Sequence, residues 1–372
     1  MPWNSNHFRT KVRFSLNKIA LKNHYLDSGI DRMIEIEGKE YFYFSGTSYL
    51  GIAQDPDFLD ILADNLFLYG ANHGQSRVNN IRLSIFDEFE ESFAMEAGAG
   101  AAAVLSSGYL AGIAAWKSAS KDADDIWIAP DAHSAVVPDD YFHSNQLNFT
   151  QWKNHCLEQS EALSSRRILI IGNAVDPFAC EIHNYDWVKE LAKKHEVSLL
   201  IDDSHAFGTF GNSIYGTYEQ LRNPAINLLV SGSLGKGLGM PAGIILGSES
   251  QIDKIKATPL FGGASPGSPA HLKTFLDMDY LYMEKKKWLS DACGIFAQET
   301  AKISQIHGSK HFPAFLYKDE SWAKEFEKAG IITSSFPYPT AESPSVNRIV
   351  ISAFHELGDL MYLNEIIHDL AR

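Results

Sequence analysis

Apolar and polar positions along this chain alternate in a way that predicts strands followed by helices. Short apolar runs between polar turns indicate buried strands, and apolar side chains that recur every three or four positions indicate helices. We expect strands at 101–105, 126–128, 167–171, 226–230, 242–246 and 348–353, and one ending at 202. We expect helices over 57–69, 86–97, 109–118 and 187–195, and from 356 onward.

This alternation predicts an α/β fold in which helices wrap a mainly parallel sheet. A more polar, helical region follows Pro269, and the chain closes with a strand and an amphipathic helix. We therefore expect an N-terminal arm (1–44), a large α/β domain (45–275) and a smaller α+β domain (276–372), which a chain of 372 residues can accommodate.

Composition narrows the class of protein. The formal net charge of −14 argues against a nucleic-acid partner, which usually meets a basic face. Cys156, Cys180 and Cys293 are scattered and form no CxxC motif, so we expect free thiols and a cytoplasmic location. The chain has no apolar run of about 18 residues and no apolar signal core at its start, so we expect no membrane span.

One lysine, Lys236, stands in a run of small residues between two apolar strands (SGSLGKGLGM, 231–240). Buried lysines are rare unless the protein uses them. A desolvated amine can lose its proton and attack a carbonyl, so we expect a Schiff base to an aldehyde cofactor. The alternative is a glycine-rich turn that carries a solvated lysine.

A buried strand ends in two carboxylates and a histidine, at Asp202, Asp203 and His205. The exit of such a strand is where α/β proteins bind ligands. A carboxylate there can keep the ring nitrogen of pyridoxal phosphate (PLP) protonated, which makes the ring an electron sink. The same residues could instead cap the next turn, or bind a metal, although no further ligand is evident in the sequence.

Asp-Asp-Ser-His (202–205), followed by Ser-Leu-Gly-Lys-Gly-Leu-Gly (233–239), resembles the α-oxoamine synthases, a class II branch of the fold-type I PLP enzymes. This family includes 8-amino-7-oxononanoate synthase and 2-amino-3-ketobutyrate CoA ligase. The resemblance extends from about residue 43 to the C-terminal helix. It is also carried by residues 49–51, 69–77, 107–109, 131–134 and 352–355.

The resemblance implies a fold-type I PLP-dependent transferase and gives roles to four residues. Lys236 would hold PLP, and Asp202 would face its ring nitrogen. His133 would stack on the ring, and His205 would lie near the O3′ oxygen. A histidine on a surface loop is the alternative for His133.

The cofactor phosphate has its own predicted contacts. Ser107, Gly108 and Tyr109 follow a strand and open a helix, and backbone N–H groups at a helix N-terminus bind anions. The resemblance adds Ser233, where the family usually has threonine, and Ser265, which would reach the phosphate of the other subunit. A homodimer with a shared active site is therefore expected. Ser107 could otherwise be an ordinary N-cap, and Ser265 a plain turn residue.

Substrate residues match the family less well. Arg348 falls on the second arginine of an Arg-x-Arg motif, whose first position is Val346, and a guanidinium can grip a substrate carboxylate with two hydrogen bonds. Thr47 replaces an asparagine that helps to hold this carboxylate. The family's Ser-Met-Asp-Gly is Pro-Phe-Ala-Cys over 177–180, and several glycines of its Gly-rich loop (72–81) are changed.

The resemblance implies an activity like that of 8-amino-7-oxononanoate synthase in biotin biosynthesis. An amino acid would be condensed with an acyl-CoA, or with an acyl group on a carrier protein, and carbon dioxide would be lost. Lys236 would act as the general base. An aminotransferase needs the same lysine and aspartate, and a catalytically weakened scaffold that binds a partner protein is a third alternative.

Overall fold

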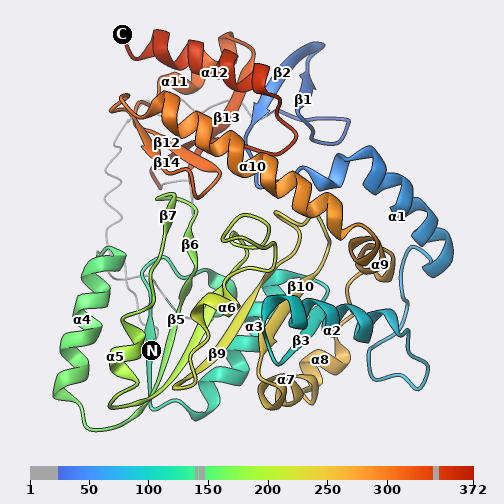
Figure 1. The fold of residues 1–372 in the computed structure, drawn as a ribbon, viewed down its shortest axis with the longest axis vertical. Coiled ribbons are helices and arrows are strands. Elements are labelled where there is room, and N and C mark those ends of the chain that lie inside the picture. Colours follow the sequence, from blue (N-terminus) through green and yellow to red (C-terminus); the bar gives the residue numbers. More distant parts are fainter. Residues whose placement is uncertain (1–23, 139–140, 142–146, 338–342) are drawn as a thin grey trace, which may run out of the picture.

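The computed structural model describes residues 24–138, 141, 147–337 and 343–372. Its central sheet is the predicted mainly parallel one (Figure 1). The last four strands of this sheet pair in parallel, whereas β10 pairs antiparallel with both of its neighbours. In spatial order the strands are β3 (Ala101–Leu105), β10 (Gly243–Gly247), β9 (Ile226–Ser233), β8 (Glu196–Asp202), β5 (Arg167–Asn173) and β4 (Asp125–Ile128).

A second sheet lies at the other end of the molecule (Figure 1). Adjacent strands in this sheet pair antiparallel, except for β2 and β13, which pair in parallel. The spatial order is β1 (Met33–Ile36), β2 (Lys39–Phe44), β13 (Ile331–Pro337), β14 (Ser345–Val350), β12 (Ala314–Tyr317) and β11 (Ile306–Gly308). A short hairpin, β6 (Val175–Asp176) and β7 (Glu181–Ile182), follows β5.

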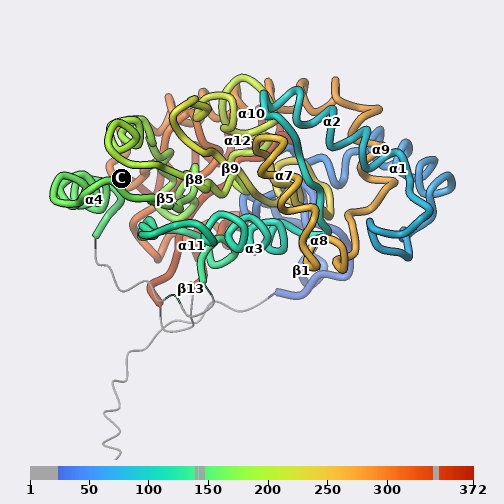
Figure 2. The backbone as a smooth tube through the Cα atoms, turned by 90° about the horizontal axis from the view of Figure 1, so that it is seen from below, coloured from blue at the N-terminus to red at the C-terminus, as the bar shows by residue number. Residues whose placement is uncertain are grey.

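Helices cover both sheets, and α3 packs on β8, β9 and β10. The helix α10 runs diagonally past the second sheet and contacts α12, as Figures 1 and 2 show. The α-helices are α1 (Pro56–Tyr69), α2 (Ile85–Ala97), α3 (Gly108–Ala119), α4 (Phe149–Ala162), α5 (Val188–Leu191), α6 (Tyr218–Leu221), α7 (Glu249–Lys256), α8 (Pro259–Gly263), α9 (Pro269–Asp277), α10 (Asp279–Thr300), α11 (Trp322–Lys328) and α12 (Leu357–Leu370). Single 3₁₀ turns are η1 (Ile52–Gln54), η2 (Ser120–Asp122) and η3 (Ser134–Val136).

Local sequence explains where several helices begin. Asp55 caps α1 by accepting hydrogen bonds from two backbone N–H groups, and Pro56 occupies the first helical position, where its missing N–H costs nothing. Ser248 and Gln251 form a reciprocal capping box at the start of α7. Because these caps satisfy N–H groups that have no partner within the helix, they fix the helix starts.

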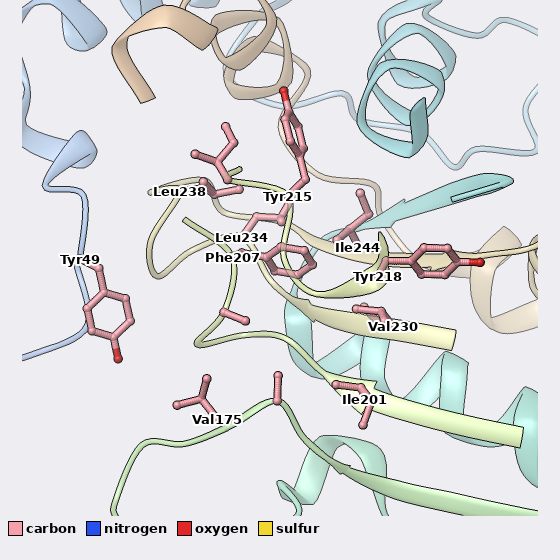
Figure 3. Packing of buried hydrophobic residues seen from close by; sticks show 14 of the residues in the cluster. Tyr49, Val175, Ile201, Phe207, Tyr215, Tyr218, Val230, Leu234, Leu238 and Ile244 are labelled. Atoms are coloured by element: carbon pink, nitrogen blue, oxygen red, sulfur yellow. The ribbon is translucent and has the colours of Figure 1, made fainter. Parts of the chain in front are cut away.

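The hydrophobic core continues from the central sheet into the loop that follows β9. Figure 3 shows Ile201 and Val230 on neighbouring strands, with Leu234 and Leu238 on this loop. Leu234 and Leu238 are fully buried and lie on either side of Lys236 in the sequence. We call residues 234–242 the lysine loop. Its two leucines anchor the loop to the core and thereby fix the position of the lysine between them.

Two predicted elements differ from the structure. The predicted helix over 187–195 is helical only over α5, because the chain turns back into β8 and His195 Nδ1 accepts a hydrogen bond from the Arg166 N–H (3.2 Å). The strand predicted at 348–353 begins earlier and ends at Val350, because the N–H groups of Ile351 and Ala353 bond to carbonyls outside the ladder.

The N-terminal hairpin β1–β2 belongs to the segment for which we predict an arm, and it pairs with β13 of the C-terminal sheet. Residues 1–23 of that segment lie outside the described residues. The domain limits at 44/45 and 275/276 stay a prediction. Among the helices that the structure describes, none has both the length and the apolar character needed to cross a membrane.

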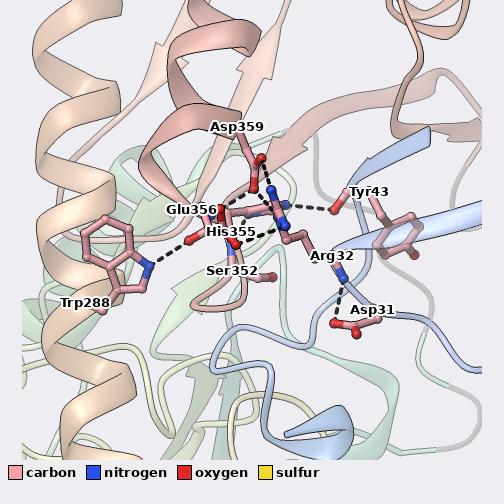
Figure 4. A network of polar contacts seen from close by, with 8 residues as sticks. All are labelled: Asp31, Arg32, Tyr43, Trp288, Ser352, His355, Glu356 and Asp359. Atoms are coloured by element: carbon pink, nitrogen blue, oxygen red, sulfur yellow. Dashed lines mark hydrogen bonds and ion pairs between the residues drawn. The ribbon is translucent and has the colours of Figure 1, made fainter. Parts of the chain in front are cut away.

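A polar network ties this hairpin to α12 (Figure 4). Arg32 donates from Nε and Nη2 to the two carboxylate oxygens of Asp359 (2.7 and 2.8 Å). The buried imidazole of His355 stacks on Phe44 (4.0 Å between ring centroids), and its Nε2 lies 3.0 Å from the Tyr43 carbonyl oxygen. The first and last described elements of the chain therefore form one unit.

Candidate active site

The predicted residues of the site meet at the carboxyl ends of β8 and β9. Asp202 is the last residue of β8 and pairs with Ser231 on β9. Beyond Ser233 the chain leaves the sheet and enters the lysine loop. Parallel strands therefore bring a carboxylate and an amine to the same sheet edge, although 34 positions separate them in the sequence.

Lys236 is partly buried, and its Nζ lies 2.7 Å from His205 Nε2. Burial lowers the pKa of Lys236 to about 8, opposed by the attraction of Asp202 and assisted by the repulsion of Arg348. A substantial fraction of this amine is therefore neutral near physiological pH, so Lys236 can act as a nucleophile or a base.

His205 is hydrogen-bonded on both ring nitrogens. Its Nδ1 lies 2.8 Å from the Tyr49 hydroxyl, opposite the contact with Lys236. Burial, and then the nearby charges of Lys236 and Arg348, hold the pKa of His205 well below its usual value. The imidazole is therefore neutral at physiological pH.

Asp202 and His133 face one another. Asp202 is 7% exposed, and its Oδ1 accepts a hydrogen bond from the Ser204 N–H (2.8 Å). Its Oδ2 lies 3.9 Å from His133 Nδ1. The His133 side chain remains 42% exposed, and burial lowers its pKa against the opposing effect of Asp202. One carboxylate oxygen of Asp202 thus points toward the partly exposed imidazole of His133.

The neighbouring carboxylate serves the fold instead. Asp203 is fully buried and accepts hydrogen bonds from the Thr217 N–H (2.6 Å) and hydroxyl (2.8 Å). Burial raises the pKa of Asp203 to about 7. Asp203 is therefore bound within the fold by Thr217, 14 positions on. The capping alternative describes one oxygen of Asp202, which accepts from the Ser204 N–H of the next turn, while its other oxygen lies near His133.

The predicted phosphate contacts gather where α3 begins. Ser107 is the exposed N-cap of α3, and its side chain accepts a hydrogen bond from the Leu110 N–H (3.2 Å). Gly108 lies so close to the end of β9 that a Cβ on it would stand 2.5 Å from Ser233 Cα. The Ser233 hydroxyl accepts a hydrogen bond from the Gly235 N–H (3.1 Å). The start of α3 therefore lies against Ser233, three residues before Lys236 in the sequence.

The other two residues predicted to contact the cofactor, Tyr109 and Ser265, are exposed to solvent. Tyr109 is 49% exposed, and its ring meets the His133 ring edge-on at 6.3 Å between centroids. Ser265 is exposed between α8 and α9. A Cβ on Gly267, two residues further on, would stand 3.0 Å from Ala242 Cβ at the end of the lysine loop. The Ser265 segment therefore packs near the loop, and Ser265 itself faces outward.

Of the predicted substrate residues, Arg348 reaches the site and Thr47 is linked to it through the backbone. Arg348 is 5% exposed, donates from Nη1 to the Pro177 carbonyl (2.8 Å) and lies over the Phe178 ring (5.8 Å). Its Nε is buried without a hydrogen-bond partner among the described residues. The carbonyl of Thr47 accepts a hydrogen bond from the Tyr49 N–H (2.9 Å).

Sequence reasoning missed the residues that support His133. Asn173 Oδ1 accepts a hydrogen bond from the His133 N–H (3.1 Å), and its Nδ2 donates to the Asp131 carbonyl (2.6 Å). The Asp131 side chain in turn lies 2.9 Å from His183 Nε2, and the His183 ring stacks on Phe149 (3.8 Å). Asn173 ends β5, two residues beyond the strand predicted at 167–171, so its position just after that predicted strand was the available signal.

A metal site is not predicted from the sequence, but Asp131, Asp176 and His183 have ligand atoms within 4.8 Å of one another. Asp176 Oδ1 accepts hydrogen bonds from the Phe178 and Ala179 N–H groups (2.7 and 2.9 Å). Hydrogen bonds within the protein therefore already engage each of these three side chains.

The residues present fit PLP. A desolvated amine, a buried carboxylate and a helix N-terminus meet in one place, which are the groups that an aldehyde, a ring nitrogen and a phosphate require. The orphan Nε of Arg348 also indicates an anionic ligand, because a buried donor without a partner costs free energy.

Comparisons with known proteins agree with this arrangement. The sequence model of the family "Aminotransferase class I and II" matches residues 60–363. The chain is 27% identical over 354 residues to the 8-amino-7-oxononanoate synthase of Fervidobacterium nodosum, which covers 90% of this chain and 89% of that protein. This match confirms the resemblance to the α-oxoamine synthases.

Solved structures share the fold. A structure of SPT with PLP superposes with a TM-score of 0.78 at 18% identity, over 93% of this chain and 92% of that one. The serine palmitoyltransferase of Sphingomonas wittichii gives a TM-score of 0.76 at 16% identity, over 93% and 91% of the two chains. The predicted fold-type I α/β fold is therefore confirmed.

Proposed function

Because this chain belongs to the aminotransferase class I and II family, we propose that it is a PLP-dependent acyltransferase. It condenses an amino acid with an acyl-CoA thioester and releases carbon dioxide, as an 8-amino-7-oxononanoate synthase does. The observation that carries the proposal is the meeting of Lys236, His205, Asp202 and His133 at one sheet edge.

In this proposal Lys236 is the residue that holds PLP through its amine. Burial lowers the pKa of Lys236 to about 8, so the neutral form that attacks an aldehyde is accessible near pH 7. Lys236 would also serve as the general base for the α-proton of the amino acid, because an amine whose pKa is lowered by burial can accept a proton near the working pH.

The other residues position the cofactor and neutralise its charges. Asp202 would hold the ring nitrogen, His133 would pack on the exposed ring face, and the first N–H groups of α3 with the Ser233 hydroxyl would take the phosphate. PLP supplies a ring that accepts the electron pair left on the substrate's α-carbon. Asp202 makes this possible, because a carboxylate favours the protonated ring nitrogen.

Arg348 would hold the substrate carboxylate. Its Nε lacks a partner among the described residues and its side chain is buried, so an incoming carboxylate would satisfy a donor that is now orphaned. Its Nη1 stays on the Pro177 carbonyl, which fixes the guanidinium plane. A planar, fixed guanidinium selects carboxylates over neutral groups.

The first experiment tests the cofactor. PLP is added to the wild-type protein and to Lys236→Ala, the absorbance near the visible edge is recorded, and both are reduced with borohydride and mapped by mass spectrometry. We expect the band and a pyridoxyl group on Lys236 in the wild-type protein only. Absence of both from the wild-type protein would refute the proposal.

The second experiment separates the acyltransferase from an aminotransferase, which the family name also includes. A panel of amino acids is supplied with acyl-CoA in one series and with 2-oxo acids in the other. Release of free CoA together with carbon dioxide supports the acyltransferase. Formation of a new amino acid without CoA release identifies an aminotransferase. Acyl groups on a carrier protein replace acyl-CoA in a parallel series, because either can present the thioester.

We extend the proposal to a homodimer with a shared active site. Ser265 is exposed, as expected for a residue that serves the other subunit. Val78 (61% exposed) lies beside Gly262 in the same region, and Phe67 and Leu68 are 91% and 70% exposed at the end of α1. Exposed apolar side chains of this size suit an interface. Sedimentation of the holoprotein should give a dimer, and Ser265→Ala should weaken PLP binding; a monomer that retains PLP contradicts this.

A cytoplasmic location is part of the same proposal. Cys156, Cys180 and Cys293 are all buried and free, which suits a reducing compartment. Fractionation of cells that express the native gene tests this assignment.

A further inference from the structure

The two hydrogen bonds of His205 connect Lys236 to a tyrosine that the proposed function does not use. Tyr49 is fully buried and lies between β2 and η1, on a chain segment that faces the lysine loop (Figure 3). Its hydroxyl lies 2.8 Å from His205 Nδ1, and Lys236 Nζ lies 2.7 Å from His205 Nε2. Tyr49 is therefore two hydrogen bonds away from the reactive amine.

The number of available protons decides the direction of these two hydrogen bonds. A neutral imidazole carries one N–H, so only one ring nitrogen of His205 donates and the other accepts. The ammonium form of Lys236 has three donors and no acceptor, so Nε2 must accept from it. The imidazole proton then sits on Nδ1 and is donated to the Tyr49 oxygen.

The same arrangement suits the neutral amine. An amine that donates an N–H to Nε2 keeps its lone pair free for attack on a carbonyl. If Nε2 carried the proton instead, it would donate to the lysine lone pair and occupy the electrons that the reaction needs. The productive tautomer is therefore the one with the proton on Nδ1, in both charge states of Lys236.

We propose that Tyr49 is a positioning residue that accepts the Nδ1–H of His205 and so presents a bare Nε2 to the Lys236 amine. Tyr49 remains a neutral phenol, because burial raises its pKa. The proposal rests on the proposed function for its meaning in catalysis, whereas the proton arrangement itself holds in the cofactor-free chain.

The charged and titratable groups around this pair agree with the assignment. Lys236 faces Asp202 and Arg348 as well as His205, and His205 also faces His133. Two cations beside His205 disfavour the imidazolium, so the ring stays neutral and the choice between its two tautomers remains.

The test uses Tyr49→Phe in the full chain freed of cofactor. Without the phenolic oxygen a proton on Nδ1 would be buried without an acceptor, so it moves to Nε2 and points at the lysine. The ammonium form then loses its acceptor. We expect the pKa of Lys236 to fall by about one unit, which is a tenfold shift toward the amine. The readout is the pH dependence of Lys236 acetylation by trace acetic anhydride, followed by peptide mapping.

The matched control is Tyr282→Phe, since the Tyr282 hydroxyl donates to the Leu238 carbonyl (3.0 Å), two positions from Lys236, and does not touch His205. This variant should leave the labelling midpoint unchanged. An unchanged midpoint in Tyr49→Phe, or an equal shift in both variants, overturns the proposal.

A second measurement does not depend on either variant folding. The ¹⁵N shifts of His205 in the cofactor-free wild-type protein at pH 7 should report a protonated Nδ1, and a protonated Nε2 overturns the proposal. Failure of borohydride to fix PLP on Lys236 would refute the proposed function alone, because the labelling and tautomer measurements need no PLP.

Discussion

At the scale of single residues, the site combines desolvated groups with an arginine donor that has no hydrogen-bond partner among the described residues. Arg348 is 5% exposed, its Nε is this donor, and its Nη1 donates to the Pro177 carbonyl. A hydrogen bond to a charged group contributes about 1.5–3 kcal/mol. A lysine at this position would keep the positive charge but could not bind a carboxylate with the two parallel hydrogen bonds of a planar guanidinium.

We therefore expect Arg348→Lys to raise the KM for the amino acid by roughly ten- to hundredfold. Titration of initial rates with amino acid measures it, and PLP absorbance should be unchanged. Arg32→Lys, in the network beside α12, is the control and should leave KM unchanged. If KM is also unchanged in Arg348→Lys, this arginine does not hold the carboxylate.

The buried Asp203 gives a prediction about pH. Burial raises its pKa from 3.8 to about 7, so between these values the folded chain keeps a proton that the unfolded chain has lost. Wild-type stability from this group is therefore present at low pH and lost as the pH rises toward 7.

Asp203→Asn removes this titration. Relative to wild type, its melting temperature should rise between about pH 4 and pH 7 and stay level above pH 7. Thermal unfolding of both proteins in half-unit steps of pH measures the difference. A difference that does not vary across this range would show that Asp203 is ionised in the folded protein.

Residue chemistry could be predicted where the sequence places an unusual group in an apolar setting. Lys236 and Asp202 stand at the ends of apolar strands, and the structure brings them to one edge. Tyr49 and Asn173 could not be assigned in this way, because their roles depend on partners 156 and 40 positions away, respectively. The contacts that distinguish Asp203 from Asp202 are also tertiary, because Asp203 bonds to Thr217, whereas Asp202 Oδ2 lies near His133.

At the scale of elements, the absence of a side chain at Gly108 lets the start of α3 pack directly against the end of β9, where the lysine loop begins. A Cβ there would collide with the backbone of Ser233 at 2.5 Å, and backbone cannot rotate away as a side chain can. Gly108→Ala must therefore move α3 away from Ser233.

We expect Gly108→Ala to weaken PLP binding roughly five- to 150-fold, because overpacking of this kind costs about 1–3 kcal/mol. Gly294→Ala in α10 is the matched control: its added Cβ would meet no atom within 4 Å, so PLP binding should be unchanged and α10 slightly stabilised. Absorbance titration with PLP measures both. Equal PLP affinities in the two variants would contradict the expectation.

Most elements around the site follow from local patterns, and the exceptions have tertiary causes. Strands β3 and β9 begin where the apolar runs predict, because a strand that is buried on both faces appears in the sequence as a continuous apolar run. The shortening of α5 and the shift of β14 depend on hydrogen bonds to other segments. The hairpin β1–β2 was not predicted, although Ile34, Ile36 and Phe44 are buried, because its strands are only four and six residues long.

At the scale of the whole molecule, the chain is closed by the contact between its first and last described elements. The Asp359 side chain is 2% exposed and receives two hydrogen bonds from Arg32, whose own side chain is 34% exposed. Removing the arginine leaves a buried carboxylate short of partners.

We expect Arg32→Ala to lower the free energy of unfolding by about 1–3 kcal/mol. The control is Arg372→Ala, whose ion pair with Asp369 is exposed on both sides and should contribute close to nothing. Urea unfolding compares them. Adding Asp359→Asn to Arg32→Ala should recover part of the loss, and failure to do so would mean that the buried charge is not its cause.

The sequence by itself determined the fold class and the chemistry of the central lysine and aspartate. The fold class and this chemistry can both be predicted from short stretches of sequence, because each stretch shows an apolar run of strand length that ends in an amine or a carboxylate. Only the tertiary structure decided which hydroxyl bonds to His205, which residue binds Asp203 and which arginine donor has no partner among the described residues. Each of these properties depends on contacts between segments that are distant in the sequence. The free energy of such a contact depends on burial, which exists only in the folded chain.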